Sequence, residues 1–346
     1  MGGTLSSFPT NAAMFIKPTR LVLSAWTGHV PFGAWLVAET KPRIFVELGS
    51  HTGMSYAALC QTVAAEHLDT KCYAVDTWQG DEHAGYYGDD VFFDLAKFNE
   101  DNFANFSRLM RMTFDEAAEY FAEGTVDLLH IDGLHTYDAV RHDFETWLPK
   151  LSDRAIVIFH DTNVRERGFG VWQYWSELTK QYPGVEFDHS AGLGVLLVGK
   201  NQSPAVTRLL EIAKEPKLLQ YTKEMFASLG DSVLRRWELD RARREQFQEV
   251  QRLREQVATL SVELREKIGL NEELQREVVI SKALQEVATM TETIKTLSQD
   301  IKTLSQDNEA LRGKLRQSEE VANQLKNSVS YRMTWPLRLV RGLFRH

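Results

Sequence analysis

The chain has 346 residues, which allows one large domain or about two small ones. Hydrophobic residues make up 43% and aromatic residues 10%, and seven of the eight tryptophans precede Leu239, so we expect the globular part in the N-terminal two thirds. The formal net charge of −8 makes the chain repel polyanions, which argues against generic nucleic-acid binding.

The sequence also predicts a cytoplasmic location. Cys60 and Cys72 are the two cysteines, and both stand in apolar runs, which indicates neither a disulfide framework nor a metal knuckle. The first fifteen residues lack the basic start and long apolar run of a secretory signal. We find no apolar stretch of about 18 residues that could span a bilayer, so any membrane contact is expected to be peripheral.

A helical lead-in is expected over residues 1–42, and a doubly wound α/β domain over residues 43–200. From Arg43 onwards, short apolar runs alternate with helical stretches, which is typical of a parallel sheet covered by helices. The connections of such a sheet are right-handed. The predicted strands are Ile44 to Leu48, Cys72 to Asp76, Arg108 to Met112, Val126 to Ile131 and Ala155 to Phe159. The predicted helices are Ser55 to Glu66, Phe92 to Asn105, Phe114 to Phe121, Tyr137 to Leu148 and Val171 to Gln181.

An antiparallel hairpin is expected to close the edge of this sheet. The segment VEFDHSAGLGVLLVG, residues 185–199, has two short apolar runs separated by a turn that contains Ser and Gly. The resulting fold class is Rossmann-like, with a mostly parallel sheet and a closing hairpin. A helical connector is then expected over residues 201–231.

The C-terminal third predicts a coiled coil over residues 232–327. Its composition shifts to Glu, Arg, Gln, Leu and Lys, and the heptad IKTLSQD occurs twice in tandem at residues 294–307. Asn308 falls on an a position, where a buried amide fixes register and oligomer state. The phase breaks around Ile280, which indicates a stutter or a hinge. The alternative is a single exposed helix. The two apolar seams are Val250, Leu253, Val257, Leu260 and Leu264, then Val287, Met290, Ile294, Leu297, Ile301, Leu304, Asn308 and Leu311.

A glycine turn, VELGSHTG, follows the first predicted strand and precedes a helix. Such a turn lets the backbone approach a ligand closely, although the second glycine of the GxGxxG fingerprint is missing. Asp76 ends the second strand, where an acid can accept both hydroxyls of a ribose. The alternative is a purely structural turn. The candidate cofactor contacts are Glu47, Gly49, Ser50, Gly53, Asp76 and Asp132.

Two acids and two histidines are expected to converge at the carboxyl edge of the sheet. Asp132 ends the fourth strand and His135 follows it, while His160 and Asp161 end the fifth. Neighbouring strands lie about 5 Å apart, so these side chains share one crevice. Asp132 and Asp161 suit an oxygen-preferring cation such as Mg²⁺, and either histidine is a candidate base for an acceptor hydroxyl.

Structural roles remain the alternatives for this cluster. Asp132 could bind a ligand amine or cap the following helix, and His160 could be a satisfied histidine at a strand end. The candidate catalytic residues are Asp132, His135 and His160, and the candidate metal ligands are Asp132 and Asp161.

The loop DTWQGDEHAGYYGDD, residues 76–90, combines aromatic rings with acids, a mixture that suits a sugar or another polyhydroxyl ligand. We interpret it as a lid or an acceptor site, with a second wall from residues 164–175. The alternative is an ordered surface loop without a ligand. The candidate substrate contacts are Trp78, Asp81, His83, Tyr87 and Arg165.

Four motifs together resemble a known family. They are VELGSHTGMSY, AVDTWQGDEHAGYYG, LLHIDGLHTYDAVRHDFETWLPKLS and FHDTNVRERGFGVW. Occurring in this order, they resemble the motifs of class I S-adenosylmethionine-dependent methyltransferases that occur with bacterial cell-surface polysaccharide enzymes. That family is related to macrocin-type sugar O-methyltransferases and cephalosporin-hydroxylase-like proteins. The resemblance covers about Trp26 to Gly199. It departs where macrocin-type relatives have an acidic pair and this chain has His160 and Asp161.

The resemblance implies a cofactor and a reaction. S-adenosylmethionine is expected at the glycine turn and Asp76, and the acids matching Asp132 and Asp161 are implied as ligands of Mg²⁺. The closing hairpin fits a methyltransferase rather than a dehydrogenase. We expect methyl transfer to a hydroxyl of a surface glycan or its nucleotide- or lipid-linked precursor.

The tail, residues 328–346, adds context about partners. SVSYRMTWPLRLVRGLFRH resembles the ending that follows coiled coils in bacterial polysaccharide assembly proteins. Its basic and apolar residues suit weak contact with the inner leaflet or with a polysaccharide-synthesis enzyme, strengthened by avidity in a homodimer or homotrimer. The alternative is a frayed terminus.

Two other function classes stay open from sequence. One is an assembly scaffold whose Rossmann-like head binds a ligand without chemistry. The other is a non-heme oxygenase-like role, although the chain has no recognisable motif of two histidines and one carboxylate for iron.

Overall fold

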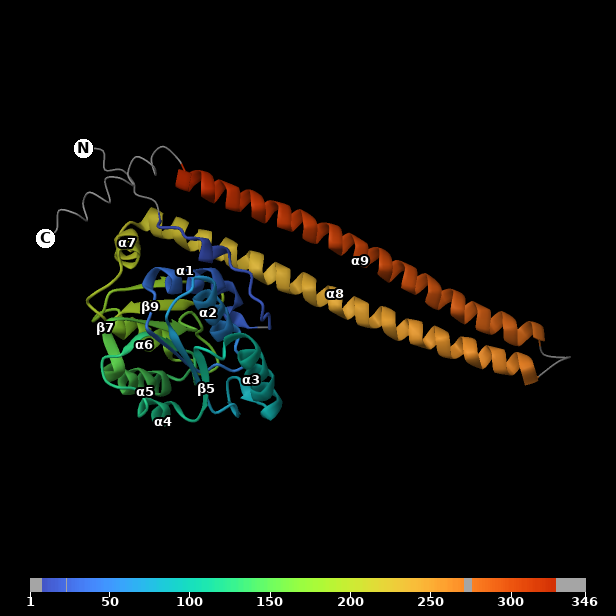
Figure 1. Cartoon of the computed structure of the whole chain (residues 1–346), viewed down its shortest axis with the longest axis horizontal. Helices are drawn as coiled ribbons and strands as arrows, with labels where there is room; N and C mark the ends of the chain where they lie inside the picture. The colour runs from blue at the N-terminus through green and yellow to red at the C-terminus, as the bar shows by residue number, and fades with distance from the viewer. Residues whose placement is uncertain (1–7, 23, 271–275, 328–346) are drawn as a thin grey trace. The chain divides into compact units, whose positions relative to one another are not determined.

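The computed structural model describes residues 8–22, 24–270 and 276–327 (Figure 1). They form two compact units, which divide between Leu234 and Arg235. The predicted tail, residues 328–346, lies outside the described residues. Within the described part of the chain, no helix is both long and apolar enough to cross a membrane.

The N-terminal unit is built on a seven-stranded sheet with the order β5-β2-β1-β6-β7-β9-β8. β5, β2, β1, β6 and β7 run parallel, β9 pairs antiparallel with β7, and β8 pairs antiparallel with β9. The predicted parallel sheet with a closing hairpin is therefore confirmed. The strands are β1 Ile44–Leu48, β2 Lys71–Asp76, β5 Ser107–Arg111, β6 Val126–Ile131, β7 Leu151–His160, β8 Gly184–Phe187 and β9 Leu193–Leu197.

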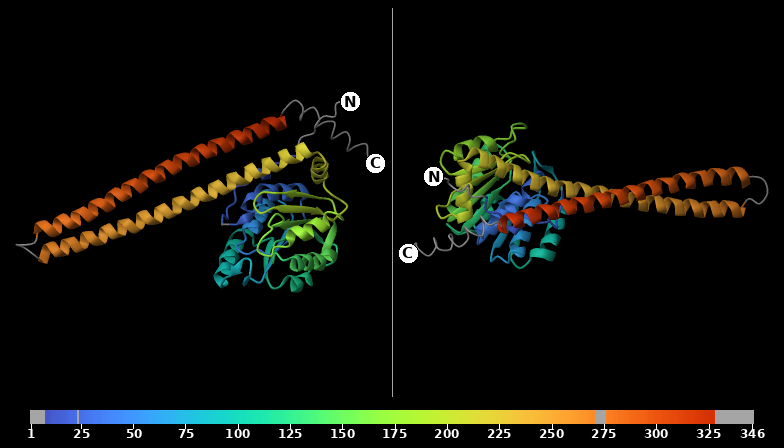
Figure 2. Two further views of the ribbon diagram at one scale, coloured as in Figure 1. Left: turned by 180° about the vertical axis from the view of Figure 1, so that it is seen from behind. Right: turned by 90° about the horizontal axis from the view of Figure 1, so that it is seen from above.

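Helices cover both faces of this sheet (Figure 2). α1, α2 and α7 contribute to one core cluster, and α4, α5 and α6 contribute to the other. Alternate residues of each strand enter opposite clusters, because side chains alternate across a sheet. The helices of this unit are α1 Val30–Thr40, α2 Met54–Ala65, α3 Asp89–Phe103, α4 Phe114–Ala118, α5 Tyr137–Trp147, α6 Val171–Leu178 and α7 Pro204–Ala213, with short 3-10 helices η1 Ala12–Phe15, η2 Ala25–His29 and η3 Leu148–Lys150.

The structure differs from the predicted elements at two places. β7 begins at Leu151, four residues before the predicted Ala155, because Leu151 pairs with Val126 of the neighbouring strand β6; the Ser152 hydroxyl also donates to Asp127 of that strand. The loop after β2 holds a small hairpin of β3 Gly80–Asp81 and β4 Gly85–Tyr86, which the sequence pattern did not predict.

Two long helices complete the described chain, α8 Pro216–Leu270 and α9 Arg276–Asn327. The first turns of α8 belong to the globular unit, where Phe226 is fully buried in the core. The expected phase break around Ile280 does not interrupt the backbone, because α9 runs through that residue as a continuous helix.

Gly230 of α8 packs closely against η2. A Cβ at this position would lie 2.1 Å from the carbonyl oxygen of Gly28. We predict that Gly230→Ala destabilises the N-terminal unit by about 1–3 kcal/mol through overpacking, measured as the free energy of unfolding by tryptophan fluorescence. Gly313→Ala in α9 is the matched control, since a Cβ there meets nothing within 4 Å. Equal free energies of unfolding for the two variants would contradict the close packing at Gly230.

Candidate active site

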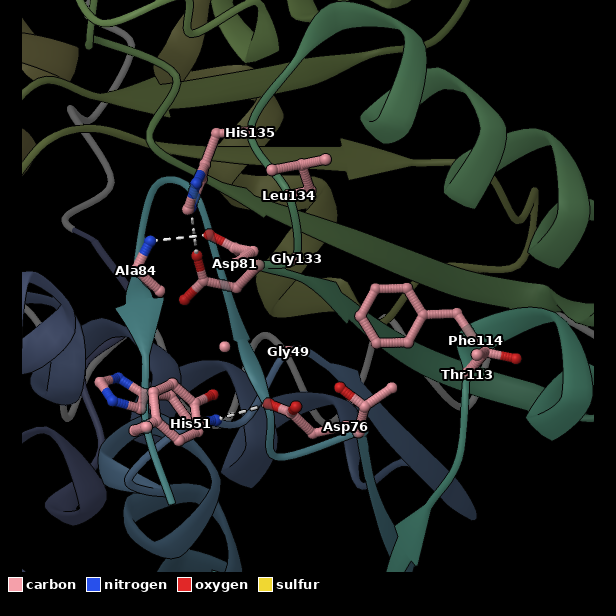
Figure 3. Close-up of a pocket in the computed structure, with 14 residues that line it drawn as sticks. Gly49, His51, Asp76, Asp81, Ala84, Thr113, Phe114, Gly133, Leu134 and His135 are labelled. Atoms are coloured by element: carbon pink, nitrogen blue, oxygen red, sulfur yellow. Dashed lines mark hydrogen bonds and ion pairs between the residues drawn. The ribbon is translucent and has the colours of Figure 1, made fainter. Parts of the chain in front are cut away.

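A cavity of about 230 Å³ opens at the carboxyl ends of β1, β2 and β6 (Figure 3). Loops that follow these strands supply its walls, and the segment after β5 and the β3–β4 hairpin complete it. This is the crevice in which doubly wound sheets bind ligands. The lining residues are Gly49, His51, Asp76, Thr77, Gly80, Asp81, Ala84, Tyr87, Thr113, Phe114, Asp132, Gly133, Leu134 and His135.

The glycine turn after β1 brings two loops into contact. Gly49 has a φ of +88°, and a Cβ there would lie 2.1 Å from the carbonyl oxygen of Asp132. Gly53 has a φ of +75°, and a Cβ there would meet the side chain of Leu95 at 2.3 Å. Both glycines are therefore needed by the backbone. Gly49 lines the cavity, whereas Gly53 forms the N-cap of α2.

Asp76 ends β2 and organises the loops beside it. Its Oδ2 accepts a hydrogen bond from the backbone N–H of His51 at 2.9 Å, and its Oδ1 accepts one from Trp78 at 2.7 Å. Both donors adopt left-handed backbone conformations, with φ of +44° and +50°. Each carboxylate oxygen keeps a second lone pair, so Asp76 can still accept hydroxyl donors from the cavity.

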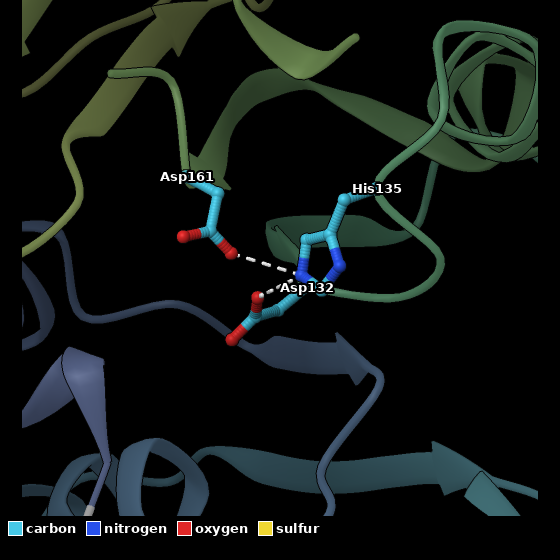
Figure 4. A group of neighbouring side chains, drawn as sticks. All are labelled: Asp132, His135 and Asp161. Carbon is cyan, nitrogen blue, oxygen red and sulfur yellow. Dashed lines mark ion pairs between the residues drawn. The ribbon is translucent and has the colours of Figure 1, made fainter. Parts of the chain in front are cut away.

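Two carboxylates and two imidazoles converge at the ends of β6 and β7, and Figure 4 shows three of these side chains, Asp132, His135 and Asp161. His135 Nε2 lies 2.9 Å from Asp161 Oδ2 and 3.5 Å from Asp132 Oδ1. His160 Nδ1 lies 3.1 Å from Asp161 Oδ2 and 3.3 Å from Asp132 Oδ1. Asp161 has a φ of +59°, a strained backbone of the kind found at functional sites. The expected convergence is present.

Electrostatic pairing sets the charges of this cluster. Burial alone would raise the pKa of Asp132, but His160 and His135 outweigh it and lower that pKa; the pKa of Asp161 is lowered in the same way. Burial likewise opposes the charged imidazoles, yet the two carboxylates raise the pKa of His135 to about 9 and that of His160 to about 10. In this arrangement both histidines carry protons at neutral pH.

Asp132, His135 and Asp161 form a candidate cation site. One ligand atom from each lies within 4.8 Å of the others. Two carboxylates suit a hard divalent cation, and the imidazole widens the choice to metals such as Mn²⁺ that also accept nitrogen. The His160 side chain is only 4% exposed and does not line the cavity. Its Nδ1 faces the carboxylate of Asp161 instead.

Glu47, a predicted cofactor contact, does not line the cavity. Its side chain is fully buried, and Oε2 lies 2.9 Å from Nδ1 of His130 on the neighbouring strand. His130 in turn accepts a hydrogen bond from Trp26 Nε1 at 3.1 Å. Strand alternation places Glu47 and His130 on the face covered by α1, away from the cavity. Ser50 is also buried and does not line the cavity, and its hydroxyl has no hydrogen-bond partner among the described residues.

The predicted substrate residues divide into two groups. Asp81 and Tyr87 line the cavity, and the Tyr87 ring stacks on His51 at 4.7 Å. Trp78 is a correction, because its left-handed backbone turns the ring into the core, where Nε1 donates to the carbonyl oxygen of His51. Arg165 does not line the cavity either, since its guanidinium lies over the exposed side of Trp172.

His83 lies near the cluster without lining the cavity. Three rings gather there: that of Phe169 lies 4.6 Å from His83 and 4.5 Å from His135, and the two imidazoles lie 5.6 Å apart. Arg167 donates to the carbonyl oxygen of His83 at 2.8 Å. The loops after β2 and β7 therefore meet beside the cluster, but no residue of the predicted second wall, 164–175, lines the cavity.

Sequence reasoning missed part of the lining. Thr113 and Phe114 follow β5, and the rule that ligands bind at carboxyl ends of strands would have pointed to them. His51 stands within the glycine turn, but nothing in its spacing indicated a contact with Asp76. His29 was missed as well: it is fully buried, its ring is 5.6 Å from that of His160, and burial lowers its pKa well below the usual value.

One part of the chain resembles a known family of domains. Residues 46–162 match the family model of a methyltransferase domain. The matched region runs from β1 to the end of β7, and it includes Asp76, Asp132 and Asp161. All residues that line the described cavity fall within the part of the chain that matches this model.

A relative with a similar sequence extends the comparison beyond this domain. Uncharacterized protein y4gI of Sinorhizobium fredii is 47% identical over 231 residues. The match covers 67% of this chain and 25% of the relative, so the chain spans about a quarter of that protein's length.

Solved structures with a similar fold share little sequence with this chain. The methyltransferase PaMTH1 of Podospora anserina is 13% identical, with a TM-score of 0.40 over 57% of this chain and 99% of that one. The O-methyltransferase TomG of Streptomyces achromogenes is 13% identical, with a TM-score of 0.39 over 56% and 92%.

Asp143 on α5 predicts a pH dependence of stability. Burial raises its pKa to about 7, and nearby Asp115 adds to the rise against the opposing effect of His142. The folded protein therefore holds this proton more tightly than the unfolded chain. Its contribution to stability is complete below about pH 4, and it decreases by about 1.4 kcal/mol per pH unit until about pH 7.

Asp143→Asn should remove this loss. Between pH 5 and pH 8 the free energy of unfolding, measured with urea, should fall less in the variant than in the wild type. Asp138→Asn, at an exposed position of the same helix, is the control. Parallel pH profiles for wild type and Asp143→Asn would refute the assignment.

Proposed function

We propose that this protein is an S-adenosylmethionine-dependent O-methyltransferase that acts on a sugar hydroxyl of a cell-surface polysaccharide or its precursor. One observation carries the proposal: a cavity between Asp76 and the Asp132–His135–Asp161 group lies within the part of the chain that matches a methyltransferase domain. The cavity thus has a carboxylate, Asp76, that can accept hydrogen bonds from ribose hydroxyls, and a second group that can act on the oxygen to be methylated.

The lining residues fit the cofactor. Asp76 has free lone pairs toward the cavity, Gly49 lets the backbone approach a ligand, and Phe114 offers a ring beyond β5. S-adenosylmethionine, when bound, supplies an electrophilic methyl group on a sulfonium. The protein's contribution is to hold the ribose at Asp76, so that the methyl donor is aligned with the acceptor.

A sugar acceptor is supported by the wall that the β3–β4 hairpin and the residue after it provide. Asp81 lines the cavity as a hydrogen-bond acceptor, and the half-buried Tyr87 offers an aromatic face beside it. Burial, Asp76 and Asp81 raise the pKa of Tyr87, so its phenol keeps the proton that it can donate to a hydroxyl oxygen. Carboxylates and aromatic rings together suit polyhydroxyl ligands.

The cluster provides for removal of the acceptor's proton. Asp132, His135 and Asp161 would hold a divalent cation, whose chemistry when bound is to lower the pKa of a coordinated hydroxyl. His135 lines the cavity and pairs with Asp161 at 2.9 Å, so in the absence of a cation it can receive the proton only in its neutral form, which its raised pKa of about 9 confines to alkaline pH. His160, which does not line the cavity, pairs with the carboxylates of Asp132 and Asp161.

Further parts of the proposal concern location and partners. We place the protein in the cytoplasm at the inner membrane, with the basic tail of residues 328–346 contacting anionic lipid and a polysaccharide-synthesis enzyme supplying the acceptor. The composition of the tail supports this placement. The opposing candidate, a scaffold whose head binds ligand without chemistry, is excluded by any turnover of S-adenosylmethionine.

Cofactor binding is the first test. Calorimetric titration of the full chain with S-adenosylmethionine should give micromolar affinity. Asp76→Ala should raise Kd about 10- to 100-fold because it removes hydrogen bonds to a charged acceptor, and Asp76→Asn should raise it less. Asp101→Ala changes an exposed carboxylate on α3 and should leave Kd unchanged. No binding by the wild type would defeat the proposal.

Chemistry is the second test. Transfer of labelled methyl to a panel of sugars and nucleotide sugars should fall at least about 100-fold in kcat for His135→Ala and for Asp161→Asn, with cofactor affinity retained. His142→Ala, at an exposed imidazole, is the control. Loss of activity with a chelator and its return with Mg²⁺ or Mn²⁺ would assign the cation. Full activity of both site variants would overturn the assigned chemistry.

A further inference from the structure

One face of α9 carries a regular apolar stripe. Each member is partly buried, and most positions between them are exposed. The spacing alternates between three and four residues, which is the seam of a coiled coil. We call these residues the α9 stripe: Val287, Met290, Ile294, Leu297, Ile301, Leu304, Asn308 and Leu311.

The residue types of the stripe indicate two strands. With Asn308 at an a position, the other a positions hold β-branched Val287, Ile294 and Ile301. The d positions include Leu297 and Leu304. In parallel coiled coils, β-branched residues at a with leucine at d favour dimers over trimers and tetramers.

Asn308 supplies a register. Residues 294–300 and 301–307 are identical heptads, so a shift by one heptad would preserve much of the apolar packing. Such a shift would place Asn308 against an aliphatic residue and leave its amide buried without a partner, which is costly. Only the unshifted pair matches Asn308 with Asn308 of the second copy.

The charges beside the stripe favour parallel strands in the same register. In a parallel pair, a g residue faces the e residue five positions later on the other strand. This rule pairs Asp307 with Arg312 of the second copy, and Lys314 with Glu319 of the second copy. Both pairs have opposite charges, and both are formed twice in a symmetric dimer.

We propose that α9 pairs with α9 of a second copy of this chain as a parallel, in-register, two-stranded coiled coil. The α9 N-termini of the two copies then lie at one end of the coil and their C-termini at the other.

Oligomeric mass gives the first test. Light scattering of the full chain should report twice the chain mass of 39.6 kDa. Leu297→Asp should reduce it to the monomer mass while S-adenosylmethionine binding is retained, which shows that the head stays folded. A monomeric wild type would indicate that the stripe packs against the same chain, and a trimeric or tetrameric mass would refute two strands.

Cross-linking tests orientation and register. Leu311→Cys places a thiol at a d position, where the two copies meet only in a parallel, in-register pair. It should form a disulfide-linked dimer on air oxidation, whereas Gln306→Cys, at an outward f position, should not. The native Cys60 and Cys72 are buried and remain in both variants. A dimer in which Leu311→Cys fails to cross-link would overturn the proposal.

Asn308→Ile tests the register lock. The variant should stay oligomeric and resist urea better than the wild type, because an apolar a position packs more favourably. In the Leu311→Cys background it should lower the yield of the cross-link several-fold or give higher oligomers. An unchanged yield and an unchanged mass would show that Asn308 does not set the register.

Discussion

The site depends on one interaction: two buried carboxylates and two imidazoles at the ends of β6 and β7 neutralise each other's charge. Asp132 and Asp161 are held close together, and two like charges at such a distance need positive charge between them. His135 and His160 supply it, at 2.9 Å and 3.1 Å from Asp161. The same carboxylates can exchange this pairing for a divalent cation, which makes the cluster suited to handling a proton on an acceptor oxygen.

The sheet explains how residues distant in sequence share this place. β1, β2, β6 and β7 are parallel, so their carboxyl ends meet at one edge. Sequence reasoning could therefore find Asp76, Asp132 and Asp161 from the ends of predicted strands alone. Strand and helix positions were also predictable, because the period of apolar residues differs between the two.

Side-chain direction was the part that the sequence could not give. Glu47 is one residue from the end of β1, and the alternation of the strand sends it to the α1 face, where it pairs with His130. Trp78 follows Asp76 by two residues, but a left-handed backbone turns its ring into the core. The N-terminal helix α1 is another example: its near-continuous burial comes from packing on α2 and α7, which local pattern does not reveal.

The central claim is that the carboxyl-edge cavity binds S-adenosylmethionine between Asp76 and the Asp132–His135–Asp161 group. A crystal structure of the full chain with S-adenosylhomocysteine tests it most directly. The account predicts both ribose hydroxyls within hydrogen-bond distance of the Asp76 carboxylate, with the sulfur directed toward Asp132 and His135. A ligand bound elsewhere, or bound with its ribose away from Asp76, would contradict it.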